Sequence, residues 1–327
     1  MKFSIKILIL LFGFFLVGNY VLKNSPNENE SPNIFLQKTK SIFQPSSVKI
    51  LAFGDLMLGR YVETLISRGE NMFENISEIK ADFPTDYIFT NLENPITESE
   101  IAIDKAINLK MSPSNTYFLK ENGINLVSLA NNHNEDYFQQ GINDTIKYLN
   151  EYQIKHFGIQ NQPLILEKNE IKIGFFGINA LWGDITPYYT LIEENKTLVD
   201  YLIISIHWGD EYQSQPNQSQ IQIGHKLIDA GADIVLGGHP HTTQPIEKYN
   251  DGIIFYSLGN FIFDMINPIT HKELGVGLEL EKNKMSFQLF PMTVVNFKPE
   301  PLPYDQAILE CQDLAPEIEL DECKFVI

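Results

Sequence analysis

The sequence predicts an α/β fold, a layered sheet whose strands alternate with helices in one domain over residues 48–300. Two observations predict this class. Short apolar runs of strand length recur along this part of the chain, and segments with helical periodicity lie between them. A third observation predicts where the function lies. Polar residues able to bind metal follow the ends of several runs, and the carboxyl ends of strands are where α/β sheets bind ligands.

Six apolar runs are predicted as buried strands, namely residues 48–53, 87–90, 126–130, 171–177, 202–206 and 232–236. Helices are predicted over three segments, 114–122, 138–152 and 218–230. Gly231 then follows the last helix, as glycine commonly does at a helix C-terminus. After residue 245 the pattern changes to two hairpins, residues 246–249 with 253–258 and residues 278–281 with 285–290. The first hairpin contains the turn signal Asp251-Gly252.

The N-terminus predicts export. An uncharged apolar run, residues 7–22, lies between Lys6 and Lys23, and as a helix it would span about 24 Å. The hydrocarbon core of a membrane is ~30 Å thick, and snorkelling of the two lysines covers the difference. Because no A-x-A cleavage site follows, residues 1–23 are predicted to be a transmembrane signal anchor, with a cleaved signal peptide as the alternative.

Residues 24–47 are rich in Asn, Ser, Pro, Glu and Gln and are predicted to be a linker. The domain that follows is expected outside the cytoplasm at the cell membrane, or secreted or periplasmic if the signal is cleaved. Residues 301–327 are expected to form a C-terminal tail that contains the only two cysteines, Cys311 and Cys323. In an exported protein a disulfide between them is reasonable, and free thiols are the alternative.

The charge balance excludes some partners. The chain has 24 Lys and Arg against 42 Asp and Glu, a formal net charge of -18. Such an acidic protein lacks the basic surface that binds nucleic acid, so no nucleic-acid partner is expected. The same charge argues against docking on anionic lipid, although it does not affect an inserted anchor.

The strongest chemical signal is the stretch Gly237–Pro245, in which His239 and His241 are one residue apart after the strand predicted at 232–236. Imidazoles presented in this way are natural ligands for transition metals. Taken alone, such a pair is more often part of a solvated loop. Its meaning therefore depends on which other side chains converge on it.

Seven groups able to hold a metal follow apolar runs closely: Asp55, Glu93, Asn132, His133, His207, His239 and His241. Each has an ordinary alternative, such as capping of a turn by Asp55, turn formation by Asn132 or core packing of the histidines. Together they predict a site, because buried carboxylates and imidazoles are costly unless they are paired or bind metal. The remaining histidines, His156, His225 and His271, are expected to be structural or solvated.

Six motifs in this order resemble the CapA-type poly-γ-glutamate capsule-synthesis proteins (PGA_cap family), themselves similar to calcineurin-like metallophosphoesterases. The motifs are Gly54–Arg60, Asn91–Glu93, Ala130–His133, His207–Tyr212, Gly238–His241 and Tyr256–Asp264. The resemblance covers residues 48–265. It implies a four-layer α/β/β/α metallophosphoesterase-like sandwich with two divalent ions, for which Mn, Fe and Zn are equally suitable.

The resemblance also implies roles for individual residues. Asp55 and His241 would bind the first ion, Glu93 would lie between the two ions, and the second ion would be bound by Asn132, His207 and His239. His133, with Asn132, would lie beside the scissile group as a general acid or charge stabiliser. Met57 stands where the wider superfamily commonly has a metal-binding histidine. Residues expected to touch substrate or support the ligands are Arg60, Asn131, Trp208, Glu211 and Asn260. Packing is the alternative for Trp208, and turn formation is the alternative for Asn260.

These implications lead to three functional hypotheses. The first is an exported, membrane-anchored protein of poly-γ-glutamate capsule or exopolymer biosynthesis, with a hydrolase-like metal site that acts on an anionic polymer. The alternatives are a metal-dependent phosphoesterase unrelated to capsule, and a non-catalytic scaffold of a polymer synthase or export complex. Polymer synthesis needs an activated carboxylate, and the sequence has no G-x-x-x-x-G-K-[ST] nucleotide loop. ATP-driven ligation would therefore belong to a partner subunit.

Overall fold

Two β-sheets stack face to face in residues 46–327, the part of the chain that this computed structural model describes. The predicted signal segment 1–23 and nearly all of the predicted linker lie outside the described residues. Within residues 46–327, no helix has both the length and the apolar character needed to cross a membrane.

The first sheet has the strand order β14-β13-β12-β1-β2-β3-β4, with β11 paired to β1 and β15 paired to β13. Its strands are β1 (Val48–Leu56), β2 (Tyr87–Leu92), β3 (Leu126–Ser128), β4 (Lys155–Phe157), β11 (Asn260–Ile262), β12 (Lys272–Glu281), β13 (Lys284–Val295), β14 (Lys298–Pro301) and β15 (Lys324–Val326). Strands β1 to β4 are mutually parallel, so their carboxyl ends meet at one edge.

The second sheet has the order β5-β6-β7-β8-β10-β9. Its strands are β5 (Leu164–Lys168), β6 (Ile171–Asn179), β7 (Tyr201–His207), β8 (Ile234–Gly238), β9 (Thr243–Tyr249) and β10 (Gly252–Leu258). The four central strands, β6, β7, β8 and β10, are parallel, and β9 returns antiparallel as the predicted hairpin. The ends of β7 and β8 therefore lie together.

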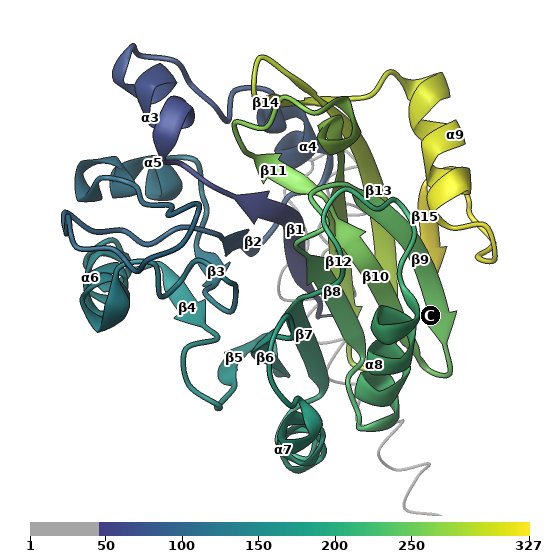
Figure 1. The fold of residues 1–327 in the computed structure, drawn as a ribbon. Coiled ribbons are helices and arrows are strands. Elements are labelled where there is room, and N and C mark those ends of the chain that lie inside the picture. Colours follow the sequence, from purple (N-terminus) through teal and green to yellow (C-terminus); the bar gives the residue numbers. More distant parts are fainter. Residues whose placement is uncertain (1–45) are drawn as a thin grey trace, which may run out of the picture. The chain divides into compact units, whose positions relative to one another are not determined.

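Helices cover the outer faces of both sheets, so the molecule is a mixed α/β sandwich (Figure 1). The helices are α3 (Arg60–Ser67), α4 (Ile76–Asp82), α5 (Thr116–Glu121), α6 (Phe138–Glu151), α7 (Thr186–Lys196), α8 (Gln218–Asp229) and α9 (Tyr304–Leu314), with 3-10 turns η1 (Pro113–Asn115) and η2 (Pro268–His271). One buried cluster fills the space between the sheets. A second packs the first sheet against α3 to α6, and a third packs the second sheet against α7 and α8.

All six predicted strands and both predicted hairpins are present, as are the helices predicted at 114–122, 138–152 and 218–230. Helix α8 begins with a capping box between Asn217 and Gln220, and Gly231 follows its end at φ +113°. The helices α3, α4, α7 and α9 and the strands β5, β11, β14 and β15 were not predicted from the sequence.

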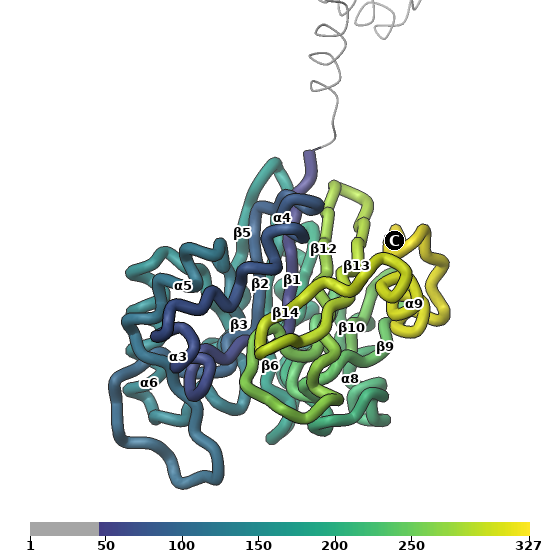
Figure 2. Tube along the Cα trace, turned by 90° about the horizontal axis from the view of Figure 1, so that it is seen from above, coloured from purple at the N-terminus to yellow at the C-terminus, as the bar shows by residue number. Residues whose placement is uncertain are grey.

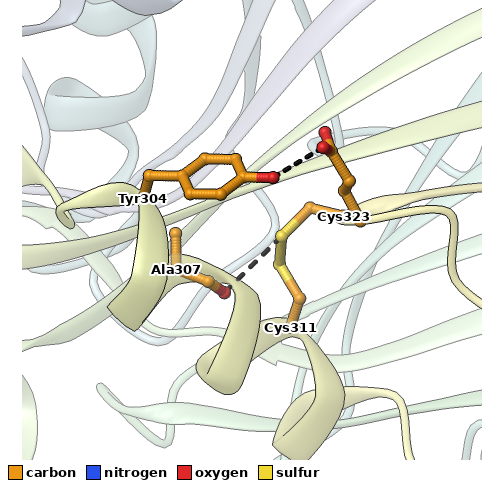
Figure 3. The surroundings of a disulfide bond; sticks show 5 residues. Tyr304, Ala307, Cys311 and Cys323 are labelled. Atoms are coloured by element: carbon orange, nitrogen blue, oxygen red, sulfur yellow. Dashed lines mark hydrogen bonds between the residues drawn. A yellow bond between two sulfur atoms is a disulfide. The ribbon is translucent and has the colours of Figure 1, made fainter.

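The C-terminal residues 301–327 belong to the same compact unit as the rest of residues 46–327. Strand β15 pairs with β13, and α9 contacts β13 and β9. Figure 2 shows this yellow end of the chain beside β13. A disulfide joins Cys311 of α9 to Cys323 just before β15, so the bridge expected between the two cysteines is present (Figure 3).

Candidate metal centre

Asp55 lies at the carboxyl end of β1, where the two sheets converge, and is fully buried. Its Oδ1 accepts a hydrogen bond from Asn91 Nδ2 at 2.7 Å, and its Oδ2 accepts one from the backbone N–H of His239 at 2.9 Å. The backbone of Gly238 approaches so closely that a Cβ there would overlap Asp55 Oδ1. Glycine is therefore needed at this point to bring the histidine loop onto the aspartate.

Glu93 follows β2 and is also fully buried. Neither of its carboxylate oxygens has a hydrogen-bond partner among the described residues. Instead, Oε1 lies 3.6 Å from His207 Nε2 and 3.9 Å from both His133 Nε2 and His241 Nε2. Two atoms bound to one metal ion at ~2.1 Å lie roughly 3 to 4 Å apart, so this spacing fits a shared cation. A buried carboxylate left without any partner would be strongly disfavoured.

Asn132 and His207 meet on the other side of Glu93. Asn132 Oδ1 lies 2.9 Å from His207 Nε2, and the rings of His207 and His239 are 4.8 Å apart. His207 Nδ1 lies 3.3 Å from Asn91 Nδ2. The amide oxygen, the imidazole nitrogen and the Glu93 carboxylate thus converge from β2, β3 and β7. These three strand ends come from both sheets.

The histidine loop after β8 has unusual backbone geometry. His239 has φ +94° and His241 has φ +56°, in a region that residues other than glycine seldom occupy. His239 Nδ1 is buried and has no hydrogen-bond partner within residues 46–327. His241 Nδ1 lies 2.9 Å from Asn260 Oδ1, which orients the ring so that Nε2 faces Glu93. Strained backbone of this kind is common at functional sites.

Burial disfavours the charged form of each of these groups, so it moves the pKa of the carboxyls and the pKa of the imidazoles in opposite directions. Burial raises the pKa of Glu93 well above its usual range, and the nearby Asp55 and Glu211 charges raise it further. Burial also raises the pKa of Asp55, opposed by its hydrogen bonds. Burial lowers the pKa of His207 well below its usual range and the pKa values of His239 and His241 to about 4. The imidazoles are therefore neutral at pH 7, the form that binds metal.

Three sets of side chains bring ligand atoms within 4.8 Å of one another: Glu93 with His207 and His239, Asp55 with Glu93 and His241, and Glu211 with His239 and His241. Glu93, His239 and His241 each occur in two of the sets. The three sets therefore overlap, and they mark adjacent positions for metal ions rather than a single position. Carboxylate, amide and imidazole groups together suit Mn, Fe or Zn, so the residues present fit a divalent metal centre.

His133 is held by two residues that were not anticipated from the sequence. Its Nδ1 lies 2.8 Å from Asp136 Oδ2, and Asp136 is fully buried. Lys105 forms an ion pair with Asp136 and donates to the backbone oxygen of Asn132 at 3.0 Å. The i+3 spacing from His133 to Asp136 could have indicated this contact from the sequence. Lys105 lies in a long loop, and no sequence pattern there indicates that it reaches His133.

The other predicted supporting residues lie in different places. Asn131 donates to Asn91 Oδ1 at 3.0 Å and accepts from the His133 N–H, so it shapes the loop. Trp208 is packed behind the second sheet and donates to the Tyr256 carbonyl at 2.8 Å, which matches its packing alternative. Arg60 is partly exposed and pairs with Asp264. Asn91, which contacts both Asp55 and His207, was not among the predicted site residues.

Met57 does not face the cluster. It is fully buried in the core beneath α3 and α4, and its sulfur accepts the Gly59 N–H at 3.0 Å. The three histidines that were not expected in the site have other surroundings. His225 contacts Glu247 at 2.9 Å, His156 lies on β4, and His271 ends η2.

The fold and the cluster together define an α/β sandwich protein with a buried carboxylate, amide and imidazole site suited to divalent metal. The chain belongs to the family described as bacterial capsule synthesis protein PGA_cap, whose pattern it matches over residues 49–265.

Two curated relatives show the same similarity. The chain is 32% identical over 282 residues to the PGA biosynthesis protein CapA of Bacillus subtilis (strain 168), covering 77% of this chain and 73% of the relative. It is 28% identical over 281 residues to the capsule biosynthesis protein CapA of Bacillus anthracis, covering 76% and 68%. Among solved structures, a hypothetical protein from Thermus thermophilus aligns with a TM-score of 0.47 and 15% identity, over 78% of this chain and 98% of that chain.

Proposed function

We propose that this protein acts in the biosynthesis of a poly-γ-glutamate capsule or a related exopolymer, using a metal-dependent, hydrolase-like site. The observation that carries the proposal is its membership of the PGA_cap family, together with the 32% identity to a relative described as a PGA biosynthesis protein. The buried cluster around Glu93 supports the chemical part of the proposal.

We further propose that the domain works outside the cytoplasm, held at the membrane by residues 1–23. The apolar run between Lys6 and Lys23 supports the anchor. The Cys311–Cys323 disulfide supports the compartment, because disulfides persist in oxidising environments and are rare in the cytosol.

In the proposed site, Asp55 and His241 would hold one divalent ion, Asn132, His207 and His239 would hold the other, and Glu93 would serve both. When bound, such a pair supplies an activated water and stabilises charge on the attacking and leaving oxygens. His133 Nε2 faces the same space, 3.9 Å from Glu93 Oε1. Asp136 accepts a hydrogen bond from His133 Nδ1–H, which leaves Nε2 to exchange a proton with the reacting group.

The substrate proposed for this site is an anionic polymer. With a formal charge of -18, the protein repels a polyanion over most of its surface. Attraction must therefore be local, and the metal centre is the feature that supplies it. A partner subunit would perform the ATP-driven ligation, and the protein would act beside it in a synthase or export complex.

A second candidate function is hydrolysis of a phosphate ester unrelated to capsule. The specific observation in its favour is His133, whose buried ring lies next to the proposed metal position and could protonate a leaving oxygen. Both candidate functions need the same metal centre, so they can be distinguished only by the substrate on which the protein acts.

The test uses the full-length protein in detergent, reconstituted with Mn²⁺, and offers it poly-γ-glutamate and a generic phosphodiester separately. Binding or shortening of poly-γ-glutamate, lost in His239→Ala together with bound metal, would support the first function. Turnover of the phosphodiester alone, lost in His133→Ala, would favour the second. Metal content equal in wild type and His239→Ala would overturn the metal centre. If the protein binds metal but acts on neither poly-γ-glutamate nor the phosphodiester, the remaining function is that of a non-catalytic scaffold.

A further inference from the structure

Glu211 lies in the short loop after β7 and is the exposed member of the metal-binding sets. Its carboxylate oxygen lies within 4.8 Å of ring nitrogens of both His239 and His241. The other members of the three sets are buried. From its place in the sequence, Glu211 was expected to contact substrate or support the ligands. In the structure, Glu211 lies close enough to His239 and His241 to bind the same ion as these two histidines.

The loop that carries Glu211 is built against the histidine loop. The backbone N–H of Tyr212 donates to the carbonyl of Pro240 at 2.9 Å, and Pro240 lies between His239 and His241. Tyr212 has φ +63°, and Gly209 has φ +81° with its backbone packed on the Gln220 side chain. These contacts fix the loop on both sides of Glu211. Its approach to the two histidines is therefore part of the fold.

Two buried groups of the same cluster point to a cation independently. His239 Nδ1 has no hydrogen-bond partner in the described part of the chain, and the same is true of both Glu93 oxygens. Native proteins rarely leave buried polar atoms unsatisfied, and a bound ion commonly satisfies atoms that lack a protein partner. His239, a member of the same set as Glu211, thus carries an unsatisfied ligand atom.

Each of the three metal-binding sets supplies fewer ligands than a bound ion usually has. Met57 packs beneath the helices and its sulfur accepts the Gly59 N–H, so it does not add one. The set formed by Asp55, Glu93 and His241 supplies three ligands, whereas divalent transition metals in proteins usually have at least four.

We propose that Glu211 is itself a metal ligand, closing the solvent side of the centre next to His239 and His241. This inference rests on the proposed metal site and adds a ligand to it. It assigns the acidic residue of the His207–Tyr212 motif to metal binding, on the side of the centre formed by His239 and His241.

The experiment compares Glu211→Gln with Asp210→Asn. Asp210 is the neighbouring exposed carboxylate, occurs in none of the metal-binding sets, and accepts a hydrogen bond from Asn217 Nδ2 at 2.7 Å. The two variants remove the same charge from the same loop, so only loss of a ligand distinguishes them. Metal-free full-length protein is titrated with Mn²⁺ by calorimetry and with Co²⁺ by visible absorption, which reports the coordination of the ion.

We expect Glu211→Gln to weaken binding of one ion at least about tenfold and to change the Co²⁺ spectrum. Asp210→Asn should stay within about threefold of wild type, as for a screened surface charge. Equal affinities and spectra in the two variants would overturn the role of Glu211 while leaving the metal centre intact. A wild-type protein that binds neither ion would overturn the centre and this inference together.

Discussion

His133 Nδ1 and Asp136 Oδ2 lie 2.8 Å apart in a buried contact on the far side of the ring from Glu93, the central carboxylate of the proposed metal site. The close carboxylate accepts a hydrogen bond from Nδ1–H, and Lys105 forms an ion pair with Asp136 while its Nζ lies 3.2 Å from the same His133 nitrogen. The His133 ring is thereby fixed in one tautomer and one orientation. Asp136 acts through His133 as a positioning residue.

Replacing Asp136 with Asn should release this tautomer, because an amide can present either an acceptor or a donor to Nδ1. We expect turnover of the substrate processed by the wild type to fall by about ten- to a hundredfold, with bound metal unchanged. Nitrogen chemical shifts of His133 should show the proton redistributed between Nδ1 and Nε2. The exposed neighbour Glu135 provides the control, since Glu135→Gln should match wild type. Unchanged shifts in Asp136→Asn would contradict the assignment.

The parts of this structure that could be predicted from the sequence are local ones. Asp55 and His207 lie at the ends of strands that their apolar runs identify, Glu93 follows another such strand, and parallel strands bring such ends together. The pairing of His239 and His241 was visible directly. Apolar periodicity was also sufficient for α6 and α8, which have long buried faces.

What escaped prediction depends on contacts between distant loops. Lys105 reaches His133 from a segment without periodicity, and Asn91 contacts His207 although 116 positions separate them. Strand β11 is three residues long and lies parallel to β1 beside Asp55, so its short run gave no signal. The direction of the Met57 side chain is likewise set by packing under α3, a helix that was not predicted from the sequence.

Gly238→Ala should disrupt the centre without replacing any proposed ligand. A Cβ at this position overlaps Asp55 Oδ1, so the aspartate must move away from Asn91. We expect a loss of about 1–3 kcal/mol in the free energy of unfolding and weaker Mn²⁺ binding, measured by denaturant titration and calorimetry. Gly224→Ala in α8 is the control. Its Cβ would meet only side-chain atoms, the nearest being Ile254 Cδ1 at 3.1 Å, and metal binding should be retained. Wild-type affinity in Gly238→Ala would refute the close approach.

Reduction of the Cys311–Cys323 bridge should loosen the C-terminal segment. The two cysteines are 12 residues apart and join α9 to β15, so the bridge removes loop-closure entropy from the unfolded chain. We expect the reduced protein to be less stable by about 3 kcal/mol, seen as a lower denaturant midpoint. A variant with both cysteines changed to serine should show the lower midpoint with and without reductant. A midpoint unaffected by reductant in the wild type would contradict this contribution.

Glu273 provides a prediction about pH that is separate from the proposed metal ligands. It lies on β12 opposite Met292 of β13, is fully buried, and has no hydrogen-bond partner for either oxygen in residues 46–327. Gly275, two residues after Glu273 and on the same face of β12, packs against the Phe53 ring. Burial in these surroundings raises the pKa of Glu273 well above its ordinary value of 4.5.

The unfolded chain releases the Glu273 proton above about pH 4.5, whereas the folded protein keeps it to higher pH. The folded state then binds more protons, so the stability contribution of this group is present below pH 4.5 and is lost as pH rises, by up to about 1.4 kcal/mol per pH unit. Glu273→Gln has no such proton and should lose less stability than wild type between pH 5 and pH 8. Denaturant titrations with excess Mn²⁺ in every sample measure this difference. Glu317→Gln, at an exposed carboxylate, should follow the wild-type profile, and a Glu273→Gln profile identical to both would show that Glu273 is ionised in the folded protein.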